Sequence, residues 1–168
     1  MTIPASIVRS IVMGGQSANL DDVFVKRGIF ADMVGQNDTT ITLANTYYPI
    51  SGGFTNSPIE GFSLTPDPAI QCETLESRFY EIDWHASVSC PSNSVTVKIG
   101  MRKNGTEISS SLVPGYMKNS NEAYSLSGTC VIDLEQGDKI QLVATADVST
   151  VITFYKMVTT IRDFFIVP

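Results

Sequence analysis

The feature that most constrains the fold is residues 124–146, where two short runs alternate between apolar and polar side chains. In the first run one face carries Tyr124, Leu126, Gly128, Cys130, Ile132 and Leu134. In the second run one face carries Ile140, Leu142, Ala144 and Ala146. A period of two is typical of β-strands with one buried face. Gly137, between the runs, can adopt the positive φ of a tight turn. We therefore predict a half-buried antiparallel hairpin.

Further alternating runs precede this stretch. Residues 79–90 place Trp84 in the middle of an apolar row, and residues 95–102 continue the pattern. Asn104-Gly105 is the dipeptide that suits a two-residue hairpin turn, because both central residues of that turn need φ > 0. Residues 113–121 contain proline, glycine and asparagine, and we predict an irregular surface crossing there.

Many short strands and no amphipathic helix of useful length predict an all-β, antiparallel sandwich. The predicted core comprises Tyr80, Ile82, Trp84, Val97, Ile99, Leu126, Ile132, Leu134, Ile140 and Leu142.

Charge and cysteine content limit the partners we expect. The formal net charge is −6, which repels phosphate backbones, so we expect no nucleic-acid partner. No apolar run reaches the length of a membrane span, and no secretory signal is evident, so we expect no membrane partner. The three cysteines, Cys72, Cys90 and Cys130, lack metal-site spacing. We expect buried free thiols, compatible with folding in a reducing cytoplasm.

The first 38 residues differ from the rest, and we predict an N-terminal arm (1–38) ahead of a β-domain (39–168). The start of the arm fits a short helix and a strand equally well. Its apolar residues either pack against another molecule, as a site of attachment, or extend the domain's own sheet. These residues are Ile3, Ile7, Val8, Ile11, Val12, Leu20, Val23 and Phe24.

The last predicted strand, residues 151–161, is apolar on both faces, which indicates that both faces are covered. Together with the apolar C-terminus, this pattern predicts self-association. The residues expected at the contact between subunits are Phe154, Tyr155, Phe164 and Phe165.

An ordered set of motifs resembles a known superfamily. Lys103-Asn104-Gly105 is followed by Leu134-Glu135-Gln136-Gly137-Asp138, then by Ile140-Gln141-Leu142 and finally by Phe164-Phe165-Ile166. This order is similar to that of the trimeric jelly-rolls of the complement globular-head and tumour necrosis factor superfamily, and resembles its bacteriophage virion branch most. The likeness covers residues 39–166. It implies a jelly-roll fold and a homotrimer.

The sequence also departs from the animal members of that superfamily. Arg78-Phe79-Tyr80 stands where a glycine-tyrosine pair usually opens the long strand. There is no collagen-like stalk and no secretion signal. These departures favour a virion component over an extracellular animal recognition protein.

Catalytic and metal-binding patterns are weak. Glu81, Asp83 and His85 share one face of a strand, which raises the hypothesis of a cation or acid/base site. His85 is the only histidine, so a polar strand face, in contact with water or hydrogen-bonded across a subunit boundary, is the simpler interpretation. No nucleophile motif or phosphate-binding loop occurs. We expect no catalytic residues, no metal and no cofactor.

The sequence-based hypothesis is a structural virion protein of a bacteriophage, made in the host cytoplasm and displayed on the particle as a decoration protein, head fibre or knob. Its partners would be copies of itself and a capsid or other virion protein. The alternative is a receptor-binding tip that recognises a host glycan or surface protein. Exposed aromatic residues would then be expected at one end, with Tyr116 and Phe54 as candidates.

Overall fold

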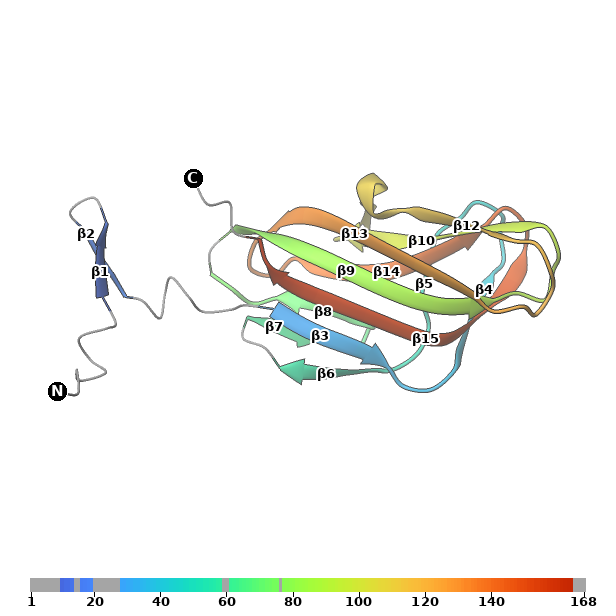
Figure 1. Cartoon of the computed structure of the whole chain (residues 1–168), viewed down its shortest axis with the longest axis horizontal. Coiled ribbons are helices and arrows are strands. Elements are labelled where there is room, and N and C mark those ends of the chain that lie inside the picture. Colours follow the sequence, from blue (N-terminus) through green and yellow to red (C-terminus); the bar gives the residue numbers. More distant parts are fainter. Residues whose placement is uncertain (1–9, 14–15, 20–27, 59–60, 76, 165–168) are drawn as a thin grey trace.

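A computed structural model describes residues 10–13, 16–19, 28–58, 61–75 and 77–164 of the 168-residue chain. For residues 10–13 and 16–19, which form the antiparallel pair β1 (Ser10–Met13) and β2 (Gln16–Asn19), only the backbone is described. The described residues between 28 and 164 form two antiparallel sheets packed face to face (Figure 1). We call them the front sheet and the back sheet, after the view in Figure 1.

The front sheet has the strand order β13-β9-β15-β3-β6, and β4 also pairs with β15. Its strands are β3 (Gly28–Met33), β4 (Asn37–Ile41), β6 (Phe54–Pro58), β9 (Arg78–Ser89), β13 (Tyr124–Leu134) and β15 (Thr150–Asp163). The last strand of the chain therefore lies between β9 and β3.

The back sheet has the order β11-β10-β14-β8-β7, and β12 pairs with β10 while β5 pairs with β14. Its strands are β5 (Tyr48–Pro49), β7 (Phe62–Leu64), β8 (Ala69–Cys72), β10 (Val95–Lys103), β11 (Thr106–Glu107), β12 (Val113–Met117) and β14 (Lys139–Ala146). A short 3-10 turn, η2 (Ser109–Ser111), precedes β12.

The core between the sheets contains the residues that the alternation places inward. Eight of the ten predicted core residues are buried, Trp84 among them, while Leu126 and Ile132 are half-buried and pack against the core. Gly128 is paired with Trp84 across β13 and β9. A Cβ on Gly128 would lie 2.7 Å from the indole Nε1, so the indole occupies the space that a side chain on β13 would take. The predicted all-β, antiparallel fold class is confirmed.

The predicted hairpin over residues 124–146 is wrong in its pairing. Both runs are strands, but β13 pairs with β9 in the front sheet, whereas β14 pairs with β10 in the back sheet. The turn at Gly137 therefore connects the two layers of the sandwich. Alternation reveals that a strand has a buried face, and it does not reveal which neighbour the strand pairs with.

Two other expectations are corrected. Residues 113–117, predicted as an irregular crossing, form β12, which pairs with β10 over its whole length. The β-domain begins at Gly28 and not at Thr39, because β3 pairs with both β15 and β6. Ile29 and Ala31 of β3 are buried in the core, so this part of the predicted arm extends the domain's own sheet.

A β-bulge explains why the sequence of β15 is apolar on both faces. The register with β9 shifts between Phe154 and Lys156. Ile152 and Phe154 before the bulge, and Met157 and Ile161 after it, all face the core and are fully buried. The extra residue exchanges the two faces of the strand. The two-sided pattern therefore reflects a change of phase, and it is not by itself evidence of a second covered face.

The two turn motifs of the sequence contact each other through the Asp138 carboxylate, an arrangement that we call the turn clip. Lys103 Nζ lies 2.6 Å from Asp138 Oδ2, and Asn104 Nδ2 donates to Asp138 Oδ1 at 2.6 Å. The Glu135 N–H also donates to Asp138, and the Lys139 N–H donates to Asn104 Oδ1. The clip joins the β10–β11 hairpin to the β13–β14 turn, which gives a physical reason for the two motifs to occur together.

The clip also acts on the acidity of Asp138. Burial alone would raise the pKa of this carboxyl group, but the hydrogen bonds from Lys103, the Glu135 N–H and Asn104 outweigh burial and hold the pKa below its usual value. Asn104 and Gly105 both have positive φ, as the predicted two-residue hairpin requires, and Lys103 pairs with Thr106 across it. The Asn104-Gly105 hairpin is confirmed.

Candidate interaction faces

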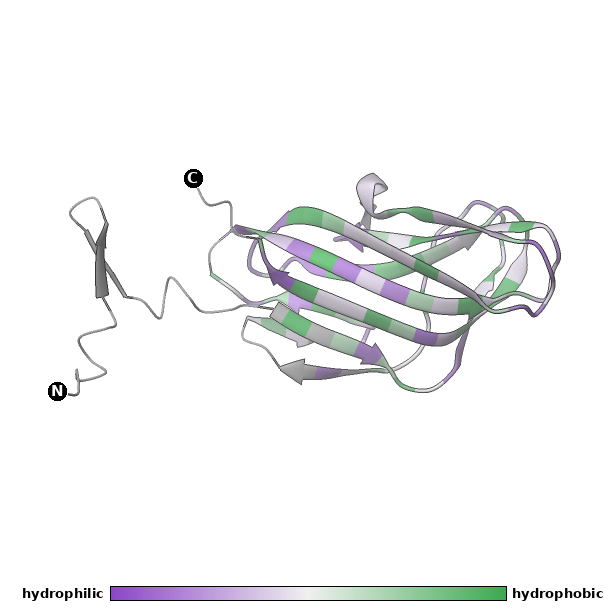
Figure 2. Cartoon of the chain, in the orientation of Figure 1, coloured by the Kyte–Doolittle hydropathy of each residue, from purple (hydrophilic) through white to green (hydrophobic). Residues whose placement is uncertain are grey.

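The outer face of the front sheet is open to solvent along β9, β13 and β15. The alternation of hydrophilic and hydrophobic residues along these strands is visible in Figure 2. Three large apolar side chains on this face are substantially exposed: Phe79 by 51%, Val131 by 44% and Tyr155 by 42%. Phe164 follows β15 and is 40% exposed, and its N–H donates to the Phe79 carbonyl. Phe79 and Val131 lie near one end of this face and Tyr155 near the other, with the open face of the sheet between them.

The charges on the front face are paired with one another. Arg162 Nε lies 2.8 Å from Glu81 Oε2, and Arg162 Nη2 lies 2.9 Å from Asp83 Oδ2. The hydrogen bond to Glu81, together with the charges of Asp83 and Glu81, raises the pKa of Arg162. Lys156 Nζ forms a second ion pair, with Asp32 Oδ2, at 2.6 Å. Both of these cations therefore have carboxylate partners, and Arg162 lies between two of them.

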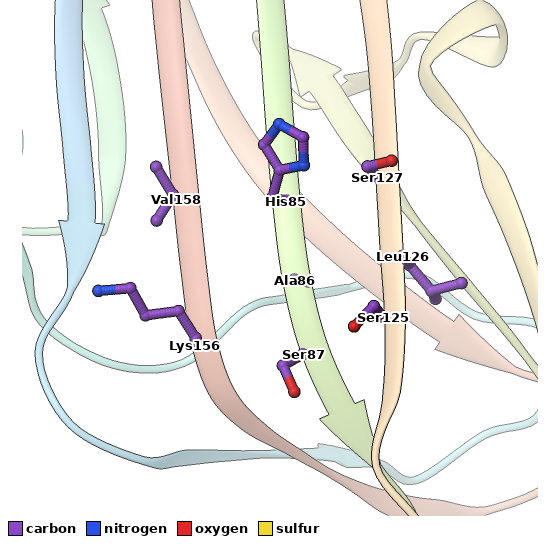
Figure 3. A pocket seen from close by; sticks show the side chains of 8 residues that line it. All are labelled: His85, Ala86, Ser87, Ser125, Leu126, Ser127, Lys156 and Val158. Carbon is purple, nitrogen blue, oxygen red and sulfur yellow. The ribbon is translucent and has the colours of Figure 1, made fainter.

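An open hollow of about 280 Å³ lies in the middle of the front face (Figure 3). Its lining comes from β9, β13 and β15 and comprises His85, Ala86, Ser87, Ser125, Leu126, Ser127, Lys156 and Val158. The small serine side chains leave the space, and the Lys156 side chain extends toward β3, where Asp32 lies.

The hypothesis of a site formed by Glu81, Asp83 and His85 is not supported by the geometry. Glu81 and Asp83 pair with Arg162, while His85 lies farther along the strand in the hollow. Among the described residues, no group of three or more histidine, cysteine or acidic side chains is arranged to hold a metal ion.

The four residues expected at a subunit contact have different positions. Phe154 is fully buried in the core, so it is unavailable for such a contact, and the bulge is the reason. Tyr155 and Phe164 are exposed, and Phe165 lies outside the described residues. The Tyr155 hydroxyl lies 3.0 Å from Ser89 Oγ, which holds its ring on the front face.

The residues predicted for attachment fall mostly outside the described part of the chain. This applies to Ile3, Ile7, Val8, Leu20, Val23 and Phe24. Ile11 and Val12 lie in β1, where only the backbone is described.

The cysteines are buried and unpaired. Burial, with a smaller contribution from the charge of Asp83, raises the pKa of Cys130 to about 11, and burial also raises the pKa of Cys90. These two thiols are therefore protonated at neutral pH and poor nucleophiles. In the described part of the chain, no helix has the length and apolar character needed to span a membrane.

The outer face of the back sheet is partly covered by the chain itself. Val143 points away from the core on β14, yet it is fully buried. It pairs with Gly100 on one side and Pro49 on the other, and Leu112 lies over Gly100. Beyond this covered region the face opens into a second hollow, lined in part by Lys98, which sequence reasoning did not identify.

Comparison with solved structures places this sandwich among known folds. The structure of Eiger TNF from S. frugiperda matches with a TM-score of 0.55 and 8% sequence identity, covering 85% of this chain and 96% of that one. Murine APRIL at pH 5.0 matches with a TM-score of 0.52 and 11% identity, covering 81% of this chain and 99% of that one. The chain has a TNF-like jelly-roll fold. Identities this low show the fold alone.

The sequence itself has no match of comparable strength. No family model matches it. No curated protein matches it either.

Proposed function

We propose that this protein is a structural, non-catalytic module that assembles as a homotrimer through the front face and is displayed on the surface of a bacteriophage virion. The observation that carries the assembly is the open front face, where three exposed apolar side chains of β9, β13 and β15 lie among charges that are already paired. The number three and the virion setting come from the superfamily resemblance of the turn motifs and the C-terminal strand.

The location of the exposed apolar residues favours the front sheet as the interface. Of the large apolar side chains that are exposed on strands of the described sandwich, Phe79, Val131 and Tyr155 belong to the front sheet and only Tyr116 to the back sheet. Burying apolar area stabilises an interface by about 25 cal/mol per Å², so several side chains of this size make a substantial contribution.

The assembly is tested by the mass of the full chain in solution. At about 10 μM, a concentration at which a trimer held with micromolar or tighter affinity persists, light scattering is expected to give three times the 18.2 kDa of one chain. Ser127 is exposed and lines the front hollow, so Ser127→Arg places a long cation in the proposed interface and should give monomers. Ser110→Arg, at an exposed serine of η2, is the matched control and should remain trimeric. A monomeric wild type, or a trimeric Ser127→Arg variant, contradicts the proposal.

Attachment through the N-terminal segment is the second part of the proposal. Because β3 begins at Gly28, removal of residues 1–27 spares the described sandwich, whereas removal of residues 1–35 would delete a core strand. The shortened chain is expected to keep its thermal unfolding midpoint and to lose binding to particles. Normal incorporation of this chain into particles would contradict the role of the segment.

The proposed location on the virion surface is tested separately, on purified particles. An antibody raised against the full chain should label the surface of intact particles in electron micrographs, and mass spectrometry of purified particles should detect the chain. Absence of the chain from purified particles would overturn this part of the proposal and leave the trimer unaffected.

A further inference from the structure

The outer face of the back sheet contains a hollow of about 200 Å³ that no role described so far requires. It is lined by Asn45, Thr96, Lys98, Thr145, Ala146 and Asp147. These residues come from three segments: the β4–β5 loop, β10, and the end of β14 with the residue that follows it. The register of β10 with β14 pairs Lys98 with Thr145. The Thr96 N–H donates to Asp147 Oδ1 at 3.0 Å, which holds the Asp147 side chain beside β10.

Some of the polar groups around this hollow have no partner within it. Thr145 is only 3% exposed, and its Oγ1 has no hydrogen-bond partner within the described structure. A buried hydroxyl without a partner is costly, which makes Thr145 unusual among the residues of the sandwich. Lys98 and Asp147 have opposite charges and line the same hollow, yet they do not form an ion pair. The hollow thus contains a hydroxyl and an ammonium group that have no partner among the described residues, beside a carboxylate of which only one oxygen accepts a hydrogen bond from them.

An aromatic side chain borders the hollow. Tyr116 on β12 is directly paired with Thr96 on β10, so both side chains lie on the same face of the sheet. Tyr116 is 58% exposed, and no hydrogen bond of its hydroxyl occurs among the described residues. An exposed aromatic ring beside a polar hollow provides an apolar surface for one side of a ligand, while the hollow provides polar contacts for its edge.

The chemistry of the lining selects the class of ligand. Asp147 and the net charge of −6 disfavour an anion, while Lys98 disfavours a cation. A volume of about 200 Å³ lies below the ~300–1,000 Å³ of sites for drug-sized molecules, and so suits a single ring. A neutral sugar ring presents hydroxyls that both donate and accept, and it has an apolar C–H face for packing on tyrosine.

We propose that this hollow binds a neutral pyranose residue of a glycan, with Tyr116 against the ring and with Asn45, Lys98 and Asp147 on its hydroxyls. Thr145 Oγ1 is buried beside Lys98, its paired residue on β10, so the proposal requires a ligand hydroxyl to displace the Lys98 side chain in order to reach it. The proposal does not depend on the structural role or on the trimer, because the hollow lies on the back sheet and the proposed interface on the front sheet.

The test uses the full chain and free methyl glycosides of glucose, galactose, mannose and N-acetylglucosamine. Saturation-transfer NMR should show transfer to at least one of them, with a dissociation constant on the order of 1 mM, as expected for a single small ring. Tyr116→Ala and Lys98→Ala should each weaken binding by about tenfold or more while leaving the thermal unfolding midpoint unchanged.

Thr145→Val should also weaken binding of the same glycoside. Its matched control is Thr159→Val, which removes another buried hydroxyl without a partner, in the core of the front sheet, and should leave binding unchanged. The proposal is overturned if no glycoside gives saturation transfer at 50 mM, or if the three variants of the hollow bind as the wild type does. Binding of heparin alone, abolished by Lys98→Ala, would replace the neutral sugar with an anionic ligand and would also overturn it.

Discussion

The two outer faces of the sandwich differ in what covers them. Along the front sheet, alternate residues of β13 are exposed from Ser125 to Asp133, and nothing in the described chain covers them. On the back sheet, Val143 and Thr145 point away from the core and are nevertheless buried. A sandwich requires only the inner face of each sheet to be buried. Residues buried on an outer face therefore indicate that another segment covers them, and apolar residues exposed on an outer face indicate that no segment does. The back sheet supplies its own cover, and we infer that the front sheet obtains one from another copy of the chain.

A charge placed on each outer face tests this difference most strongly. Val143→Lys introduces an unpaired ammonium group into a fully buried position on the back sheet, and we expect a loss of about 3–5 kcal/mol in the free energy of unfolding. Val131→Lys, on the front face, is expected to change the unfolding free energy of the monomeric Ser127→Arg variant by about 0.5 kcal/mol or less. Urea denaturation of both substitutions in that monomeric background provides the measurement. Equal losses in the free energy of unfolding would show that the outer faces of the two sheets are covered to the same extent.

The turn clip belongs to neither outer face, so its loss should weaken both sheets together. Asp138→Ala removes a buried carboxylate and leaves Lys103 and Asn104 without their partner, which we expect to cost about 2–3 kcal/mol. Hydrogen exchange should show lower protection in β13 and in β14 alike. Loss of protection in one sheet only would contradict the role of the clip as a link between the layers.

The same carboxylate predicts a dependence on pH. The folded pKa of Asp138 is lowered, so its contribution to stability is fully present above the unfolded value of about 3.9 and is lost as the pH falls through the folded pKa. The urea midpoint of the wild type should therefore fall on acidification below about pH 4 more steeply than that of Asp138→Asn. Parallel curves for the two proteins would show that other groups dominate the acid response.

Two glycines, one on each sheet, test how rigid the contacts around them are. Gly128→Ala places a Cβ 2.7 Å from the Trp84 indole, whose ring is fully buried and cannot move aside, and we expect a loss of about 1–3 kcal/mol. At Gly100, on the back sheet, the nearest atom to a new Cβ is the end of the flexible Leu112 side chain, so Gly100→Ala should cost less. Thermal unfolding of the two variants gives the order, and the reverse order would contradict this account of the packing.

The smallest expected effect concerns the two buried threonines whose hydroxyls lack partners. Thr159→Val and Thr145→Val replace a hydroxyl by a methyl group of similar size, and each should leave stability unchanged or raise it by up to about 1 kcal/mol. Differential scanning calorimetry is sensitive enough to detect such changes. A loss above 1 kcal/mol in either variant would show that its hydroxyl has a partner in solution.

The sequence predicted the inner faces of the sandwich well because alternation depends on residues that are neighbours along one strand. Trp84, Val97 and Ile140 could be assigned to the core in this way. The assignment of strands to sheets could not be predicted, since β13 and β14 alternate in the same manner whichever layer they join. The bulge after Phe154 could not be predicted from the sequence either. A strand with one inserted residue has the same pattern of apolar residues as a regular strand with two apolar faces.

The candidate sites were harder to predict, for a related reason. The hollow on the back sheet brings Asn45 close to Lys98 and Asp147, which are distant in sequence and belong to no motif. Tyr116 was identified as a candidate aromatic residue, but in a loop, whereas it lies in a strand beside Thr96. Only the pairing of β12, β10 and β14 reveals that these groups share one surface.

The position of β15 has a consequence for how the protein is made. β15, which follows every other strand of the described sandwich in the sequence, lies between β9 and β3 and also pairs with β4, so most of its contacts join residues far apart in the sequence. Until it leaves the ribosome, β3 has only β6 as a neighbour and β9 has only β13. The front layer therefore closes only after β15 has been synthesised, and contacts of such long range make folding slow. In the interval the incomplete layer has free strand edges, so newly made chains depend on rapid insertion of β15 to avoid pairing with one another.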